Sequence, residues 1–298
     1  MSHYIDRFGE QRVHHPFWDF WQVFEKNTTA LFGLLLLSLV ILMILLSPIL
    51  APYEINQQFP EATQFPPSWQ QGGNINYLLG TDALGRDLFS RILIGGRTTI
   101  GAALVVVLVA TMFGVFTALI TAFSRGWSDR IFSYVAELLL TFPSLITALL
   151  VISIIGPGLL NSIIAVIISI IPNFYKSTRN ALLTEMAKPY YIAATLDGTR
   201  GLRLLTGVLM PNIISPIIIQ ISRSFSSAML EIATLGFLGF GADSLHAEWG
   251  AIIGDAQNIS LLAPWTVWFP GLAMVLALFA INLVGDGIRE TLEQEHHS

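Results

Sequence analysis

Three ionisable side chains lie inside long hydrophobic segments of this chain: Glu137, Arg223 and Glu231. A charged group inside a bilayer is costly and usually faces the interior of a helix bundle or a water-filled path. Arg223 and Glu231 are about two helical turns apart and offset by about 80°, so they share a helix face only loosely. Either residue could line a translocation path; the alternative is a buried structural pair with another helix or subunit. Glu137 is close enough to the end of its segment to reach the membrane interface.

A second group of opposite charges lies in the sequence LGTDALGRDLFSRILIGGR, ahead of a hydrophobic segment. It contains Asp82, Arg86, Asp87 and Arg91, and the last two are four positions apart on an expected helix, a spacing that allows an ion pair. Exposed charge clusters are usually solvated faces. We therefore interpret this group as an interfacial cap held by ion pairs, in preference to a ligand site.

The sequence contains no pattern typical of an enzyme. No Gly-Lys dipeptide occurs, so there is no phosphate-binding loop, and no HExxH or GxSxG is present. There is no Cys, and none of the six His lies in an apolar segment, so we predict no metal site. The basic residues are spread over several loops and form no stripe for nucleic acid. We expect a non-catalytic chain that does not itself hydrolyse ATP.

The composition is that of an integral membrane protein. Hydrophobic residues make up 53% of the 298 positions and charged residues only 12%, against about a quarter in soluble domains. A membrane span needs roughly 20 apolar residues. The expected fold is all-α with six transmembrane helices. The six predicted segments are Ala30 to Leu50, Ile100 to Phe123, Ile131 to Ile155, Gly158 to Phe174, Ile213 to Phe240, and Trp265 to Gly287.

The distribution of basic residues predicts the orientation, because Lys and Arg of short loops stay on the cytoplasmic side. With the amino end inside, the cytoplasmic pieces hold eleven of the fifteen Lys and Arg. Only Arg86, Arg91 and Arg97 lie outside, and Arg223 falls within the fifth segment. Both termini are then cytoplasmic.

The leader contains the sequence FWDFWQVFEK from Phe17 onward, with aromatic residues spaced to gather on one helical face. These rings are expected to lie in the lipid interface, to pack on the protein's own helices, or to do both with different rings. The predicted organisation is a cytoplasmic amphipathic leader (1–29), a first transmembrane helix (30–52), a periplasmic segment (53–97), a core of five transmembrane helices (98–288) and a cytoplasmic tail (289–298).

Within that core, a polar stretch from Lys176 to Asn212 separates two hydrophobic segments and is expected in the cytoplasm. It contains PYYIAATLD, which starts with Pro189 and is followed by Gly198. Pro at the first helical position and Gly just after the end are the signals of a short helix. We predict that another protein docks on this helix.

The same stretch closely resembles the cytoplasmic signature of the inner-membrane permeases of type I ATP-binding-cassette importers. That signature has an EAA triplet, a Gly four residues after its last Ala, and a Leu-Pro about a dozen residues later. Here the triplet reads Ile192, Ala193 and Ala194, the Gly is Gly198, and the closing pair is Met210 and Pro211. Ile192 stands where the family has an acidic residue. Any salt bridge that the family forms from that position is therefore lost in this chain.

Three further stretches resemble the second permease subunit of dipeptide and oligopeptide importers. They are GTDALGRDLFSRILIGGRT, LGFLGFGADSLHAEWGAIIGDA and PWTVWFPGLAMVLALFAINLVGDGIRETL. The sequences PPSW, and IGDA followed by APWTV, are most similar to the Sap-type permease associated with antimicrobial peptides. The resemblance covers nearly the whole chain and implies the type-1 permease fold in a bacterial inner membrane.

The resemblance also implies partners and roles. A paralogous permease subunit would complete a heterodimer, a periplasmic solute-binding protein would deliver the solute, and two cytoplasmic ATPase subunits would carry ATP and Mg. This chain would bind no cofactor of its own. Small alanines would allow close approach of the ATPase, and the tyrosines would be rigid anchors. The residues assigned to this contact are Pro189, Tyr190, Tyr191, Ala193, Ala194, Gly198 and Pro211.

Other functions stay open at this point. The solute of such a permease could be a short peptide, a cationic defence peptide, a polyamine or another small solute. A proton-coupled secondary transporter would also use six spans and intramembrane carboxylates, but it should show an inverted repeat, which we do not see. A membrane scaffold or receptor without transport is a third possibility.

Overall fold

The computed structural model describes residues 16–124, 126–241 and 246–295. Residues 1–15 of the predicted leader, Arg125 and the last three residues of the predicted tail lie outside this part. Across the described residues the regular elements are helices, with one isolated bridge between Thr81 and Asp87. The prediction of an all-α fold is confirmed.

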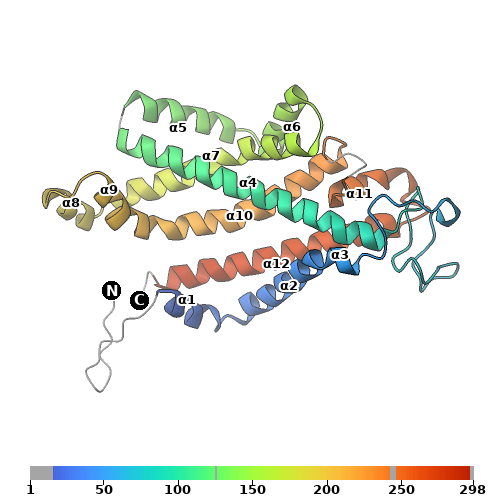
Figure 1. The fold of residues 1–298 in the computed structure, drawn as a ribbon. Coiled ribbons are helices and arrows are strands. Elements are labelled where there is room, and N and C mark those ends of the chain that lie inside the picture. Colours follow the sequence, from blue (N-terminus) through green and yellow to red (C-terminus); the bar gives the residue numbers. More distant parts are fainter. Residues whose placement is uncertain (1–15, 125, 242–245, 296–298) are drawn as a thin grey trace, which may run out of the picture.

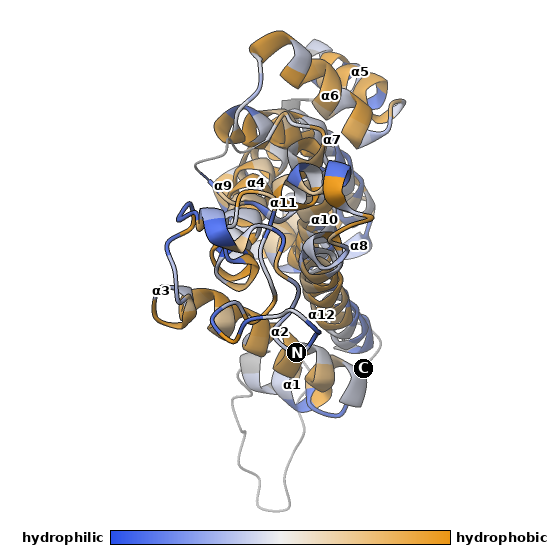
Figure 2. Ribbon diagram, turned by 90° about the vertical axis from the view of Figure 1, so that its right-hand side faces the viewer, coloured by the Kyte–Doolittle hydropathy of each residue, from blue (hydrophilic) through white to orange (hydrophobic). Residues whose placement is uncertain are grey.

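Five helices are long and apolar enough to cross a membrane, counted over the described ranges. Figure 1 shows them running roughly side by side along the length of the molecule, and most of their residues are apolar in Figure 2. They are α2 (Thr28–Leu45), α4 (Leu88–Ser124), α7 (Leu159–Met186), α10 (Met210–Phe237) and α12 (Trp265–Glu295).

The third predicted segment, Ile131 to Ile155, is wrong as a single helix. It forms α5 (Trp127–Leu140) and α6 (Ser144–Ile155), which bend by 99° relative to each other. Pro143 stands at the break in an extended conformation. Proline has no amide hydrogen to donate and disfavours the helical conformation of the residue before it, so the helix ends there. Counted as one span, the bent pair brings the total to six.

Three helices also extend beyond the predicted hydrophobic segments. Helix α4 begins at Leu88 rather than near Ile100, and α12 continues past Gly287 to Glu295. Helix α7 runs through Lys176 to Met186, so the first part of the predicted polar stretch is helical. Hydropathy marks only the part of a helix that lies in lipid. The backbone hydrogen bonds continue beyond it.

Helices α4, α7 and α10 form the main core, and small residues allow them to pack closely. Ala103 and Ala110 of α4 and Ala165 of α7 are fully buried in it. A Cβ on Gly114 of α4 would collide with the side chain of Phe174 on α7. Close backbone approach at small residues is the usual way in which membrane helices associate.

The leader helix α1 (Pro16–Phe24) and α2 both pack on α12. A Cβ on Gly33 would come within 2.5 Å of Leu283, and one on Gly287 would touch Phe24 and Ala30. Phe24 is buried there, whereas Trp18 is 61% exposed. The rings of the leader therefore divide between packing on the protein and facing outward.

The remaining helical elements are short, and several lie at the two ends of the long helices. The first group is α3 (Ser47–Leu50), η1 (Pro60–Ala62), α11 (Trp249–Asp255) and η3 (Gln257–Ile259). The second group is α8 (Pro189–Leu196), α9 (Leu202–Leu204) and the π-helical turn η2 (Leu205–Leu209). In Figure 1 the second group lies at the left end of the bundle, with the start of α1 and the end of α12, and the segment 51–87 lies at the opposite end.

Candidate functional site

The short helix predicted from Pro189 is present as α8. It begins at Pro189 and ends at Leu196, with Asp197 as the last flanking residue. Gly198 then adopts a φ of +84°, and the amides of Gly198 and Thr199 donate to the carbonyls of Thr195 and Ala194. This is the hydrogen-bond pattern of a Schellman motif, in which glycine is favoured because it has no Cβ.

Helix α8 is fastened to the end of α7 through Glu185. The Nζ of Lys188 lies 2.7 Å from Oε1 of Glu185, and the hydroxyl of Tyr190 donates a hydrogen bond to Oε2. Partial burial, together with the hydrogen bond to Glu185, raises the pKa of Tyr190 to about 12. The hydroxyl therefore remains a donor throughout the physiological pH range.

The two faces of α8 differ. Tyr191 packs against a buried cluster that includes Leu182 of α7 and Ile213 of α10. On the other face Ile192 is 51% exposed and Leu196 is 81% exposed. Of the two predicted anchors for a partner, Tyr191 is thus directed into the protein itself and Tyr190 is held by Glu185. The exposed surface of α8 is therefore mainly aliphatic, with Tyr190 partly exposed beside it.

The other predicted contact residues lie within α8 or farther along the chain. Ala193 is exposed and Ala194 is half-buried. Pro211 lies in the first turn of α10, after η2, and so belongs to a different helix. The role of the whole set in binding an ATPase stays a prediction.

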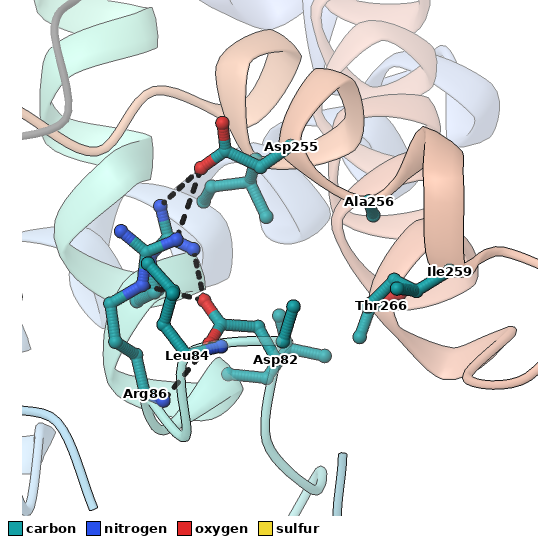
Figure 3. Close-up of a pocket in the computed structure, with 11 residues that line it drawn as sticks. Asp82, Leu84, Arg86, Asp255, Ala256, Ile259 and Thr266 are labelled. Carbon is teal, nitrogen blue, oxygen red and sulfur yellow. Dashed lines mark hydrogen bonds and ion pairs between the residues drawn. The ribbon is translucent and has the colours of Figure 1, made fainter. Parts of the chain in front are cut away.

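A second candidate site is the charged cluster at the opposite end of the bundle (Figure 3). Oδ2 of Asp82 lies 2.7 Å from Nε of Arg86 and 2.6 Å from Nη1 of Arg91. The side chains of Asp82, Arg86 and Arg91 are only 8%, 5% and 4% exposed. Ion pairs do hold this cluster, but the cluster is buried and is not the solvated face that the sequence suggested.

The predicted pair of Asp87 with Arg91 is wrong. Oδ2 of Asp87 instead accepts hydrogen bonds from the backbone amide (2.8 Å) and hydroxyl (2.7 Å) of Ser90. Amides in the first turn of a helix have no partner within the helix, so an Asp at the start of α4 caps it. Burial raises the pKa of Asp87.

Arg91 turns instead to Asp82 and to a residue that the sequence did not indicate, Asp255 at the end of α11. Oδ2 of Asp255 lies 3.1 Å from Nη2 of Arg86 and 3.3 Å from Nη2 of Arg91. Nothing in local spacing could show this contact, because it joins two helices that are distant in the sequence.

The three intramembrane charges do not form one site. The carboxylate of Glu231 is buried and accepts hydrogen bonds from the hydroxyls of Ser144 (2.5 Å) and Ser169 (3.0 Å), so it links α10 to α6 and α7. Arg223 is exposed and borders a small hollow with Asp286 of α12. Glu137 is exposed on α5. The structure therefore does not bring Arg223 and Glu231 together.

Over the described ranges, no group of three or more His, Asp or Glu residues could hold a metal ion.

Two family models match the chain. One is described as "Binding-protein-dependent transport system inner membrane component" and matches residues 110–296. The other is the "N-terminal TM domain of oligopeptide transport permease C" and matches residues 15–67.

Curated relatives match over nearly the full length. The chain is 40% identical to the di/tripeptide transport system permease protein DppC of Pseudomonas aeruginosa (strain UCBPP-PA14), over 93% of this chain and 92% of that protein. It is 38% identical to the peptide transport system permease protein SapC of Salmonella typhimurium, over 91% of this chain and 92% of that protein.

The fold is similar to that of two inward-facing crystal forms of the MetNI methionine ABC transporter. The TM-scores are 0.55 and 0.56, at 18% and 17% sequence identity. The match covers 67% and 68% of this chain and 96% and 97% of the solved chains. At such low identity the likeness concerns the fold alone.

Proposed function

Because this chain belongs to the family of binding-protein-dependent transport system inner membrane components, we propose that it is the permease subunit of an importer for short peptides, driven by separate ATPases. The chain is a multi-pass inner-membrane protein and a non-catalytic subunit. Its identities to Dpp-type and Sap-type relatives are nearly equal. The proposed solute is therefore short peptides in general, and cationic defence peptides are one subset of them.

The observation that carries this proposal is helix α8. It is a short helix with exposed aliphatic side chains, and it stands at the end of the bundle opposite the segment 51–87 (Figure 1). An exposed apolar surface is expected to be covered by a partner. In the proposed assembly each of two cytoplasmic ATPase subunits, which hold ATP and Mg, receives one such helix from a permease subunit.

The anchoring of α8 suits a part that transmits force. Glu185 ties it to α7, and Tyr191 packs it against residues of both α7 and α10. A displacement of α8 would therefore move α7 and α10 together. These two helices pack against α4 in the main core, so the movement would reach the centre of the bundle and shift it between two arrangements.

The proposed assembly also contains a paralogous permease subunit, which completes the path, and a periplasmic solute-binding protein. The start of α1 and the end of α12 lie at the same end of the bundle as α8. If α8 meets a cytoplasmic ATPase, both of these helix ends are cytoplasmic as well. The segment 51–87 would then face the periplasm and the binding protein.

A proton-coupled transporter is not favoured, because the family works with separate energy-supplying subunits and Glu231 is enclosed by two serine hydroxyls. A permease for polyamines or another small solute is not favoured either, because both named relatives are peptide permeases.

The experiment that tests the function is uptake into proteoliposomes. The two permeases, the ATPases and the binding protein are reconstituted, and the uptake of a labelled dipeptide is measured. We expect uptake that requires internal ATP and the ATPase subunits. Uptake driven by a proton gradient alone would contradict the proposal, and so would ATP-dependent uptake of putrescine with no uptake of dipeptide.

A further inference from the structure

The two carboxylates of the charged cluster are held very differently. Both oxygens of Asp82 are used, because Oδ1 accepts the amides of Leu84 and Arg86 at 2.9 Å and Oδ2 accepts the two short bonds described above. Asp255 uses only Oδ2, in two longer contacts of 3.1 and 3.3 Å. Its side chain is 50% exposed. Asp255 is therefore the member of the cluster that can leave most easily.

The position of Asp255 in its own helix gives it no further support. It is the last residue of α11, where the carbonyl ends of the helix make a negative charge less favourable. Its ion pairs with Arg86 and Arg91 are what hold it in place. Once it turned toward solvent, its charge would be hydrated instead.

A cavity of about 270 Å³ adjoins this weakly held carboxylate. Arg86, Arg91 and Asp255 line it, and Leu84, Ile252 and Ile259 are among its apolar lining. Figure 3 shows Arg86 and Asp255 close together, with Leu84 and Ile259 also in the lining. Sites for small molecules are usually of about 300–1,000 Å³. The size suits one or two amino-acid residues, with apolar contacts for a side chain.

The two arginines have spare capacity for a ligand. The Nε of Arg91 is buried and has no hydrogen-bond partner within the described structure. A guanidinium group binds a carboxylate through two parallel hydrogen bonds, whereas Asp255 offers only one oxygen to two guanidiniums. A carboxylate that enters from the cavity can improve on this geometry.

We propose that Arg86 and Arg91 form a binding site for the free C-terminal carboxylate of a short peptide, and that Asp255 occupies this site when no peptide is bound. The inference rests on the proposed function for its choice of a peptide. The exchange is neutral in charge, because one carboxylate enters as the other turns to solvent. The exchange also releases the end of α11 from the start of α4. Peptide binding would therefore loosen a contact between two helices at the end of the bundle where the segment 51–87 lies.

The test uses the complete transporter in lipid nanodiscs, without the binding protein, and the probes trialanine and trialanine amide. Binding is measured by calorimetry for the wild type, for Asp255→Asn and for Glu54→Gln. Glu54 is an exposed carboxylate of the segment 51–87 and lies outside the charged cluster, so it serves as the matched control.

We expect trialanine to bind the wild type and trialanine amide to bind at least tenfold more weakly. Asp255→Asn removes the competing charge and should strengthen trialanine binding about fivefold to tenfold, whereas Glu54→Gln should leave it unchanged. Equal binding of the acid and the amide would overturn the proposal. No gain in Asp255→Asn would overturn it as well.

The same transporter, reconstituted into proteoliposomes with the binding protein outside and ATP inside, is assayed for dipeptide uptake. Normal uptake together with a negative binding result would contradict the carboxylate site and leave the proposed function supported. If the wild type takes up no peptide under any of these conditions, the proposed function itself is contradicted.

Discussion

The hydroxyl of Tyr190 donates a hydrogen bond to the carboxylate of Glu185, and this contact fixes the exposed helix α8 to the end of the long helix α7. Lys188 adds an ion pair to the same carboxylate. In the proposed assembly α8 is the part that meets the ATPase. The rigidity of this attachment then decides how much of an ATPase movement reaches the permease.

Tyr190→Phe should weaken the coupling between ATP hydrolysis and transport without loss of the protein from the membrane. It removes one hydrogen bond to a charged acceptor on a partly exposed side chain, and we expect a loss of about 1 kcal/mol in the positioning of α8. Peptide taken up per ATP hydrolysed should fall roughly fivefold. The measurement is the ratio of uptake to phosphate release in proteoliposomes. Tyr134→Phe, at an exposed tyrosine of α5, is the control. An unchanged ratio in Tyr190→Phe would contradict the role of the hydrogen bond between Tyr190 and Glu185.

The same contact should depend on pH in the alkaline range. The pKa of Tyr190 is about 12 when α8 is docked and near 10 when the residue is free. Because the docked pKa is raised, the stabilisation is fully present below pH 10 and is lost as the pH rises toward 12. The rate at which a maleimide labels Thr195→Cys, a half-buried position of α8, should therefore rise steeply above pH 10, after correction for ionisation of the thiol itself. Tyr190→Phe should abolish this rise, and a rise of equal size in both proteins would contradict the assignment.

Gly198→Asp should uncouple ATP hydrolysis from uptake while insertion into the membrane stays intact. Nothing lies within 4 Å of an added Cβ, but the φ of +84° is unfavourable for most residues, at a cost of about 1 kcal/mol or more. The turn after α8 would then shift, and the aspartate would add a charge at the docking surface. Gly198→Asn is a milder control, since Asn tolerates a positive φ better. Ala194→Arg should also uncouple hydrolysis from uptake, because the bulk of the arginine would separate α8 from a partner. Normal uptake by Gly198→Asp, at normal expression, would count against the docking surface.

Glu231→Gln should keep the fold and alter the preference for peptide charge. The amide can still accept one of the two serine hydrogen bonds. Glu231→Ala would remove the acceptor of the Ser144 hydroxyl at a cost of about 1–3 kcal/mol, whereas the hydroxyl of Ser169 also donates to the carbonyl of Val166. If Glu231 faces the path during transport, loss of its negative charge should reduce uptake of a cationic tripeptide relative to a neutral one. Identical ratios in wild type and Glu231→Gln would remove this residue from the path.

The features that could be predicted from the sequence depend on near neighbours in the chain. Pro189 and Gly198 delimit α8 because each acts on the backbone within one turn. Hydropathy located the long helices but not their ends, since a helix such as α7 continues past its apolar part to Met186.

The features that the sequence did not predict depend on contacts across the fold. The spacing of Asp87 and Arg91 suggested an ion pair, but the free amides at the start of α4 compete for Asp87. Asp255 then meets Arg91 from a distant helix. The inward direction of Tyr191 depends on how α7 and α10 pack, which no local pattern reveals.

The most direct test of the central claim is crosslinking from α8. The natural chain has no cysteine, so Ala193→Cys and Trp69→Cys each carry a single reactive thiol, at opposite ends of the bundle. In the complete transporter, a short photoactivatable maleimide on Ala193→Cys should capture an ATPase subunit, and the same reagent on Trp69→Cys should not. Failure of Ala193→Cys to capture an ATPase in a transporter that is active in uptake, or labelling of this cysteine in intact cells by a reagent that cannot cross the membrane, would contradict the account.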